Sequence, residues 1–134
     1  MKIVVDSYAW IEIFSGTGKG SSASKVIDDA EELYTPDIVL AEIARKYRRE
    51  GLDRRTIEKR LDSITEASQI IPIDRIVALE SASAFLDLRD EAKKKGLREP
   101  SLFDAIILGT TRTAQGKVLT GDLHFKDLEE TIWL

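Results

Sequence analysis

The residues Ile3-Val4-Val5-Asp6 decide the fold that this sequence predicts. Three consecutive β-branched residues are typical of a short strand that is buried on both faces, as strands of parallel sheets are. Asp6 ends the apolar run, and Ser7 then begins a stretch in which apolar residues recur at helical spacing. A buried strand that leads directly into a helix is the first unit of an α/β fold.

Strand-like and helical segments alternate along the rest of the chain. Further strands are expected at Tyr34-Thr35, 70–73, Val118-Leu119 and Ile132-Trp133. Pro72 indicates that the strand at 70–73 either lies at a sheet edge or ends early. Helices are expected at 7–14 (ended by Gly16 to Gly20), 21–33, 36–50, 53–67, 75–95 and 101–114. The sequence therefore predicts a single domain over residues 1–134, a three-layer α/β/α sandwich with a mainly parallel sheet of four to five strands.

Composition excludes several classes of site. Apolar residues make up 43% of the 134 residues, which is typical of a globular domain. Because there is no cysteine and His124 is the only histidine, thiolate chemistry and multi-histidine zinc sites are excluded. We expect a cytoplasmic protein, since no apolar stretch is long enough for a membrane span and the N-terminus does not resemble a signal peptide.

Four acidic residues stand where predicted elements begin or end: Asp6, Glu42, Asp104 and Asp122. In open α/β sheets, ligands bind beyond the carboxyl ends of the strands, and these positions are expected to converge there. Carboxylates held close together resist ionisation unless a cation lies among them. Mg²⁺ and Mn²⁺ prefer such oxygen ligands, so the set is a candidate divalent-metal site that suits phosphodiester chemistry.

Each carboxylate also has a structural interpretation. Asp104 follows Ser101 by three residues and completes a capping-box pattern, and Asp122 is placed to cap a short helix reaching Leu128. Glu42 can pair with Lys46 one helical turn later. Asp6 is harder to explain in this way, because a carboxylate at the end of a buried strand needs a partner.

The net charge of −4 argues against a general nucleic-acid-binding surface, but basic residues cluster locally at 45–49, 54–55 and 93–98. Lys46 and Arg49 share a helix flank with Glu42 and are candidates for binding an RNA backbone. The alternative is an ordinary solvated face.

Four motifs together resemble those of PIN-domain ribonucleases, and most closely the VapC-type toxins of toxin–antitoxin pairs. They are residues 4–12 (VVDSYAWIE), 40–43 (LAEI), 101–105 (SLFDA) and 119–122 (LTGD). The resemblance implies a magnesium- or manganese-dependent endoribonuclease with Asp6, Glu42, Asp104 and Asp122 as its metal-binding residues. Thr120, or alternatively Ser7, matches the hydroxyl residue that orders the site. The family mechanism requires no histidine, so His124 is left outside the predicted catalytic set.

The resemblance also implies a homodimer and a small DNA-binding antitoxin as partner. The predicted hairpin from Pro36 to Ala67 is a candidate docking surface, although core packing explains most of its apolar residues. One alternative is a receiver-like signalling domain in which magnesium binds an acidic pocket and Asp74 accepts phosphate. A binding-only protein and an RNA-processing nuclease of the same fold are further alternatives.

Overall fold

The computed structural model describes residues 1–134 and contains a five-stranded sheet with six α-helices and one short 3-10 helix. The elements are β1 (Lys2–Val5), α1 (Ser7–Ser15), α2 (Gly18–Asp29), β2 (Glu32–Pro36), α3 (Asp37–Arg49), α4 (Arg54–Ala67), β3 (Gln69–Ile71), α5 (Arg75–Lys95), α6 (Leu102–Ala114), β4 (Lys117–Thr120), η1 (Leu123–Phe125) and β5 (Thr131–Trp133). The strand order is β3-β2-β1-β4-β5, and every neighbouring pair is parallel. The predicted α/β fold with a parallel sheet is therefore confirmed.

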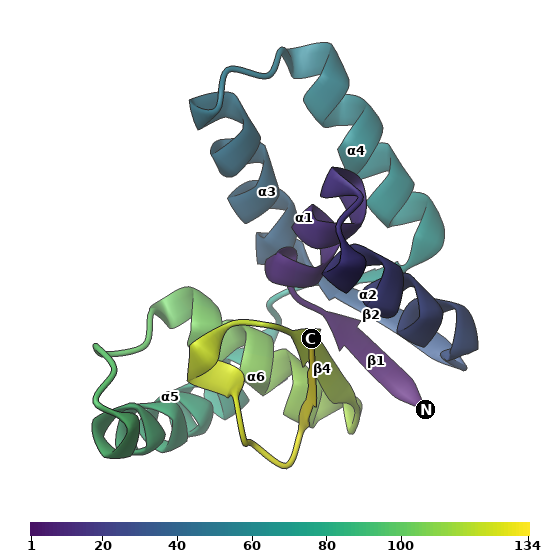
Figure 1. Cartoon of the computed structure of the whole chain (residues 1–134). Coiled ribbons are helices and arrows are strands. Elements are labelled where there is room, and N and C mark those ends of the chain that lie inside the picture. Colours follow the sequence, from purple (N-terminus) through teal and green to yellow (C-terminus); the bar gives the residue numbers. More distant parts are fainter.

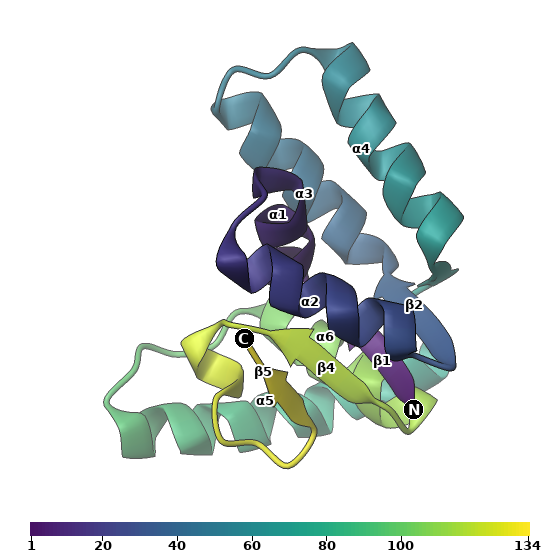
Figure 2. The ribbon, with the colours of Figure 1, turned by 45° about the vertical axis from the view of Figure 1, so that its right-hand side comes forward.

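Helices cover both faces of the sheet (Figures 1 and 2). α1 and α2 lie on one face, α5 and α6 lie on the other, and the α3–α4 hairpin extends beyond the sheet on the side of α1. None of the helices combines the length and the apolar composition needed to span a membrane.

β1 occupies the centre of the sheet, and the chain changes direction there. After β1 it moves outward to β2 and β3, and then returns to the other side of β1 with β4 and β5. The ends of β1 and β4 therefore form a topological switch point, where open α/β sheets bind ligands. Pairing of Val5 with Leu119 sets the register that brings these two strand ends together.

The buried core explains why these segments adopt their observed structure. Val4 and Val5 of β1 and Leu119 of β4 are fully buried, as the β-branched run predicted. On the helices, buried residues recur at helical spacing, such as Val39, Ile43 and Tyr47 on α3.

Two predicted helix boundaries around α2 are wrong. The predicted helix of residues 21–33 ends at Asp29, and Leu33 instead lies in β2, where it pairs with Ile3 of β1. The helix also begins earlier, at Gly18, because the Thr17 side chain caps it by accepting a hydrogen bond from the Gly20 amide at 3.0 Å. Gly20 is needed there, since a Cβ atom would lie 2.2 Å from the Glu12 carbonyl oxygen of α1.

A buried polar network attaches the α3–α4 hairpin to the rest of the domain. The Trp10 indole donates to Thr35 Oγ1 at 3.2 Å, and Thr35 Oγ1 lies 2.7 Å from Ser68 Oγ at the end of α4. Pro36 ends β2 and precedes α3, rather than occupying its first turn as predicted. Because these contacts fix the start of α3, they also fix the helix that carries Glu42.

Candidate active site

Asp6 lies at the carboxyl end of β1 and is 6% exposed. Its Oδ1 accepts the Ser7 amide hydrogen at 2.7 Å, which caps α1, and its Oδ2 accepts the Thr120 hydroxyl hydrogen at 2.8 Å. Burial raises the pKa of the Asp6 carboxyl to about 6, and the charges of Asp122 and Asp104 add to the rise, although both hydrogen bonds oppose it. A buried carboxylate is thus held at the switch point.

Thr120, the last residue of β4, is completely buried. While its hydroxyl donates to Asp6, it accepts the backbone amide hydrogen of Asp122 at 3.1 Å. The turn between them depends on Gly121, because a Cβ atom there would lie 2.4 Å from the Tyr8 ring. The segment 120–122 therefore follows one tight path from the strand to the second carboxylate.

Asp122 caps η1, as predicted, although the following helix is only one 3-10 turn rather than a segment reaching Leu128. Its Oδ1 accepts the His124 amide hydrogen at 2.9 Å and lies 3.2 Å from His124 Nδ1. On the other side of the ring, His124 Nε2 lies 2.9 Å from the carbonyl oxygen of Arg98. Since both ring nitrogens face acceptor oxygens, the doubly protonated imidazolium fits this position best.

Asp104 lies in the first turn of α6 and forms the predicted capping box. Its Oδ2 accepts the Ser101 amide hydrogen at 3.0 Å, and its own amide donates to Ser101 Oγ at 3.1 Å. Partial burial raises the pKa of the Asp104 carboxyl, and the Asp122 charge contributes, although the Ser101 amide and His124 act against the rise. Capping uses only one carboxylate oxygen, so the other remains available to the site.

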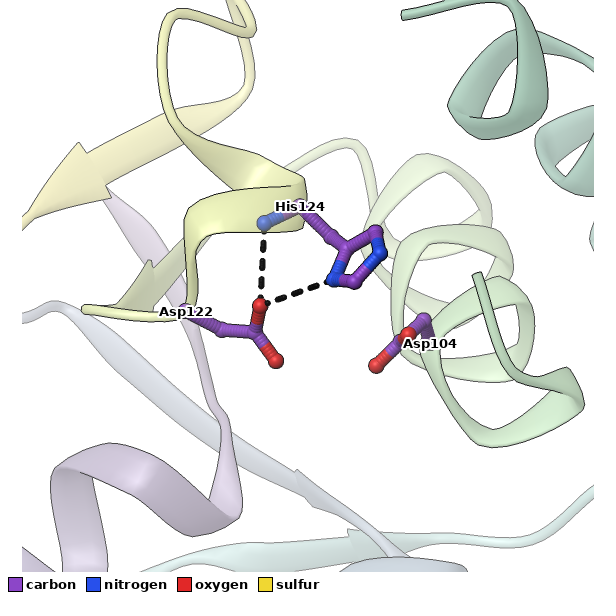
Figure 3. Close-up of side chains that lie close together, drawn as sticks. All are labelled: Asp104, Asp122 and His124. Atoms are coloured by element: carbon purple, nitrogen blue, oxygen red, sulfur yellow. Dashed lines mark hydrogen bonds and ion pairs between the residues drawn. The ribbon is translucent and has the colours of Figure 1, made fainter. Parts of the chain in front are cut away.

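The side chains of Asp104, Asp122 and His124 converge from two segments of the chain (Figure 3). Asp104 comes from the start of α6, and the other two residues come from the turn after β4. One carboxylate oxygen of each aspartate and one ring nitrogen of His124 lie within 4.8 Å of one another. With His124 protonated, the two carboxylates are the groups that could bind a metal ion there. The capping roles of both aspartates are therefore compatible with a shared site.

Glu42 approaches the same region from α3. Its pKa is raised to about 8, first by burial and then by the charges of Asp6 and Asp104. The predicted partner Lys46 instead forms an ion pair with Glu50 at 3.0 Å. Glu42 Oε1 is buried and has no hydrogen-bond partner. An ionised carboxylate in this position requires a cation, because unpaired buried charge is strongly unfavourable.

An open pocket of about 520 Å³ extends outward from Glu42 along α3. Its lining includes the predicted RNA-binding residues Lys46 and Arg49 and also Arg45. The Arg45 guanidinium lies 5.6 Å from the centre of the Phe103 ring, next to Asp104, and its charge opposes the rise in the pKa of Glu42. The pocket thus lies between α1 and α3, and its three basic residues share it with Glu42 and Glu50. We call it the basic pocket.

The charges of Asp6, Asp104 and Asp122 each raise the pKa of Glu42. The group whose potential ligand atoms lie within 4.8 Å of one another, however, consists of Asp104, Asp122 and His124 and does not include Asp6 or Glu42. Two further residues belong to this region that the sequence did not assign to it, namely Arg45 and His124. Arg45 follows Glu42 by about one helical turn, and His124 follows Asp122 by two residues. These spacings are the features of the sequence that could have predicted that both residues lie near the site. Asp74, in contrast, is exposed and caps α5 after the edge strand β3.

Several solved structures share this fold over nearly the whole chain. A toxin–antitoxin complex from Klebsiella pneumoniae aligns with a TM-score of 0.70 and 21% identity, covering 97% of this chain and 95% of that one. VapBC2 from Rickettsia felis, bound to a promoter DNA fragment, gives 0.70 and 17%, with 100% and 98% coverage. VapC20 from Mycobacterium tuberculosis, a toxin that cleaves the sarcin-ricin loop, gives 0.67 and 18%, with 92% of each chain covered.

These similarities establish a common fold, and a family model establishes the family. No curated protein matches the chain significantly in sequence. The model of the PIN domain, however, matches residues 3–130, a span that contains all four acidic residues of the site. The chain therefore belongs to the PIN domain family.

Proposed function

We propose that this protein is a divalent-metal-dependent endoribonuclease and the toxin of a toxin–antitoxin pair. The observation that supports the proposal is the mutual charge interaction of Asp6, Glu42, Asp104 and Asp122 near the switch point, next to a pocket with three basic residues. Membership in the PIN domain family and the fold shared with VapC20 support it.

The donor set fits Mg²⁺ or Mn²⁺. All four predicted ligands offer hard carboxylate oxygens, and the buried Glu42 Oε1 lacks any donor from the protein. Burial, and then the charges of neighbouring carboxylates, raise the pKa values of Asp6 and Glu42, so a bound cation would favour their ionised forms. A divalent cation held there supplies Lewis-acid chemistry toward a phosphodiester.

The chain's own residues would position the ligands and the substrate. Thr120 orients Asp6 and the backbone of Asp122 through one hydroxyl, which suits the ordering role predicted for it. The alternative hydroxyl, that of Ser7, lies 3.4 Å from Asp6 Oδ1 and also lines the basic pocket. Thr120 is better placed for this role because its contact with Asp6 is short and fully buried.

RNA would enter along α3. Lys46, Arg49 and Arg45 line the pocket beside Glu42, and phosphate groups bind such side chains electrostatically. Arg45 is held over the Phe103 ring, so less of its side-chain freedom is lost when it contacts a phosphate. The overall charge of −4 makes this basic pocket the favoured region for an anionic backbone.

A small DNA-binding antitoxin and a second copy of the chain are the proposed partners. The fold shared with complexes of Klebsiella pneumoniae and Rickettsia felis supports the antitoxin. The α3–α4 hairpin offers a groove of about 410 Å³ lined by Ala44, Ile57 and Leu61 together with charged residues. An upstream gene for a short DNA-binding protein that co-purifies with this chain would support the pair, and cleavage that such a protein leaves uninhibited would argue against it.

The decisive experiment is cleavage of a panel of RNAs with Mg²⁺, with Mn²⁺ and with a chelator. Wild-type protein should cleave only with metal, and Asp6→Asn and Asp104→Asn should abolish cleavage. Asp74→Asn is the matched control, because Asp74 also caps a helix but lies outside the site, and it should cleave like wild type. Persistent cleavage in both site variants would show that the proposed site is wrong or that a contaminant is active.

Asp74 is also the residue that tests the receiver-like alternative, in which it would accept a phosphate. Labelling of Asp74 by acetyl phosphate without any nuclease activity would favour that function. Its exposed position, away from the acidic site, gives a phosphate on Asp74 no shared metal ligands. A processing nuclease of the same fold would cleave RNA without an antitoxin partner.

A further inference from the structure

A second pocket, of about 340 Å³, adjoins the basic pocket and shares Ser7, Ile11 and Lys46 with it. We call it the Tyr8 pocket, and its other lining residues are Asp6, Tyr8, Glu12 and Asp122. Its volume falls within the range of pockets that bind small molecules. Because two of the four predicted metal ligands line it, a phosphodiester bound at the carboxylates would place one of its flanking nucleotides here.

Tyr8 is the only aromatic residue that lines this pocket. It stands in the first turn of α1, two residues after Asp6, and its ring packs against the backbone of Gly121, where a Cβ atom would lie 2.4 Å from ring atom Cε1. No other aromatic ring of the chain stacks on it. A ring that is held beside the site and has no stacking partner offers a base a platform at little cost in side-chain freedom.

Lys19 contacts the hydroxyl end of the Tyr8 side chain. Its Nζ donates a hydrogen bond to the Tyr8 hydroxyl at 2.9 Å and lies 5.5 Å from the ring centre. These two distances place the ammonium group beyond the hydroxyl rather than over a ring face, so it does not block stacking on the ring. Lys19 is exposed, and a phosphate in solution could therefore reach its charge.

The charges around the Tyr8 pocket favour a base inside it and a phosphate at its Lys19 end. Asp6, Glu12 and Asp122 line the pocket, and its one basic lining residue, Lys46, already forms an ion pair at the end of α3. Away from a bound cation, such a lining repels a phosphate but accepts an uncharged base. Lys19 supplies the positive charge that the next phosphate of an RNA strand needs.

We propose that the Tyr8 pocket binds an unpaired base next to the cleaved phosphodiester, stacked on the Tyr8 ring, while Lys19 binds the following phosphate. This inference rests on the proposed nuclease function and names its substrate class, RNA that is single-stranded at the cleavage site. A base in a duplex is stacked between its neighbours and hydrogen-bonded to its partner, so it cannot enter such a pocket. Purines should bind better than pyrimidines, because the larger ring system stacks more strongly.

The first test measures stacking without cleavage, in an Asp104→Asn background with Mg²⁺. Short single-stranded RNAs carry the fluorescent base 2-aminopurine at each position in turn, and its emission falls when it stacks on an aromatic ring. Binding should quench one position strongly. Tyr8→Leu should abolish that quenching and weaken binding roughly 5- to 100-fold, whereas Tyr8→Phe should retain the quenching because it keeps the ring.

Tyr34→Leu is the matched control for this test. Tyr34 is also a half-buried tyrosine, but it lies on β2 and does not line the Tyr8 pocket, so its replacement should leave binding and quenching unchanged. Circular dichroism checks that each variant is folded. Quenching that survives Tyr8→Leu, or RNA that does not bind at all, would overturn the proposal.

The second test concerns the phosphate contact. Lys19→Ala should leave the quenching in place but make the slope of log binding constant against log salt concentration shallower by about 0.7, the contribution of one contact with single-stranded phosphate. Lys25→Ala is the matched control, since Lys25 is also exposed on α2 but is not a hydrogen-bond partner of Tyr8. An unchanged slope in Lys19→Ala would overturn the role assigned to Lys19.

The third test removes the base from the substrate instead of the ring from the protein. An RNA with an abasic nucleotide at the quenched position should have a raised KM, and Tyr8→Leu should add little to that loss, because both changes remove the same contact. Losses that add in full would overturn the proposal. Tyr8-dependent quenching without cleavage of any RNA would refute the nuclease function but retain the binding site, whereas cleavage that neither change affects would overturn the binding site alone.

Discussion

The Thr120 hydroxyl donates a hydrogen bond to Asp6 Oδ2 at 2.8 Å and so joins two strand ends that are 114 residues apart in the sequence. The same oxygen accepts the Asp122 amide hydrogen at 3.1 Å. One buried hydroxyl thus orients two of the four carboxylates, because β1 and β4 are neighbours in the sheet.

Thr120→Val should therefore impair both stability and activity. The substitution keeps the shape of the side chain but leaves Asp6 Oδ2 and the Asp122 amide unpaired, at a cost of about 1–3 kcal/mol in the free energy of unfolding. Loss of this donor should also raise the pKa of Asp6 above about 6 and shift the pH profile of cleavage upward. Denaturant titration and pH–rate profiles measure the two effects.

Thr120→Ser is the control for that substitution, because serine keeps the hydroxyl while losing a methyl group. It should retain the wild-type pH profile. A valine variant with unchanged profile and stability would show that the hydroxyl does not order the site.

Stability of the metal-free protein should fall as the pH rises. In the folded state the pKa of Asp6 is raised from 3.8 to about 6, and that of Glu42 from 4.5 to about 8. Because the folded protein holds these protons more tightly than the unfolded chain, their stabilising effect is complete below the unfolded pKa values. It is lost progressively as the pH rises to about 8. Urea unfolding in chelator across this window measures the slope, and Mg²⁺ should reverse the loss at its upper end.

Glu42→Gln should remove most of the slope between about 6 and about 8, the folded pKa values of Asp6 and Glu42. A neutral amide creates no charge repulsion there, so the metal-free variant should be more stable than wild type near the upper limit. Cleavage should nevertheless be lost, because a ligand is missing. If the variant kept the wild-type slope, the titration would belong to another group.

His124 should titrate above its ordinary pKa of 6.5 in the metal-free protein. Burial favours the neutral ring, but the Arg98 carbonyl and the Asp122 carboxylate raise the pKa of His124 overall by accepting hydrogen bonds from both nitrogens. Its imidazole is the only one in the chain, so the NMR signal is unambiguous. Asp122→Asn should lower the midpoint, and a wild-type midpoint at or below 6.5 would contradict the imidazolium assignment.

Replacing Lys46 and Arg49 together by alanine should weaken RNA binding and make it less dependent on salt. The slope of log binding constant against log salt concentration should become shallower by about 1.4, since each lost contact with single-stranded phosphate contributes about 0.7. Binding is best measured in an Asp104→Asn background, which prevents cleavage. Alanine at Lys93 and Lys94 is the matched control, since that basic pair ends α5 outside the pocket. An unchanged slope after loss of Lys46 and Arg49 would exclude their role.

Local sequence patterns predicted most elements because each is governed by nearby residues. The run Ile3-Val4-Val5 specified a buried strand, and Ser101 with Asp104 specified the start of α6. Leu33 was misassigned because its spacing also continues the preceding helix. Only its pairing with Ile3 in the neighbouring strand favours the extended conformation.

The sequence alone determined the α/β fold, the four candidate carboxylates and their position near strand and helix ends. Tertiary structure decided which of their atoms remain available. It left Glu42 Oε1 without a donor and brought His124 between Asp122 and the Arg98 carbonyl. Strand and helix propensities act over a few residues, whereas desolvation and charge interactions depend on groups that only the folded chain brings together.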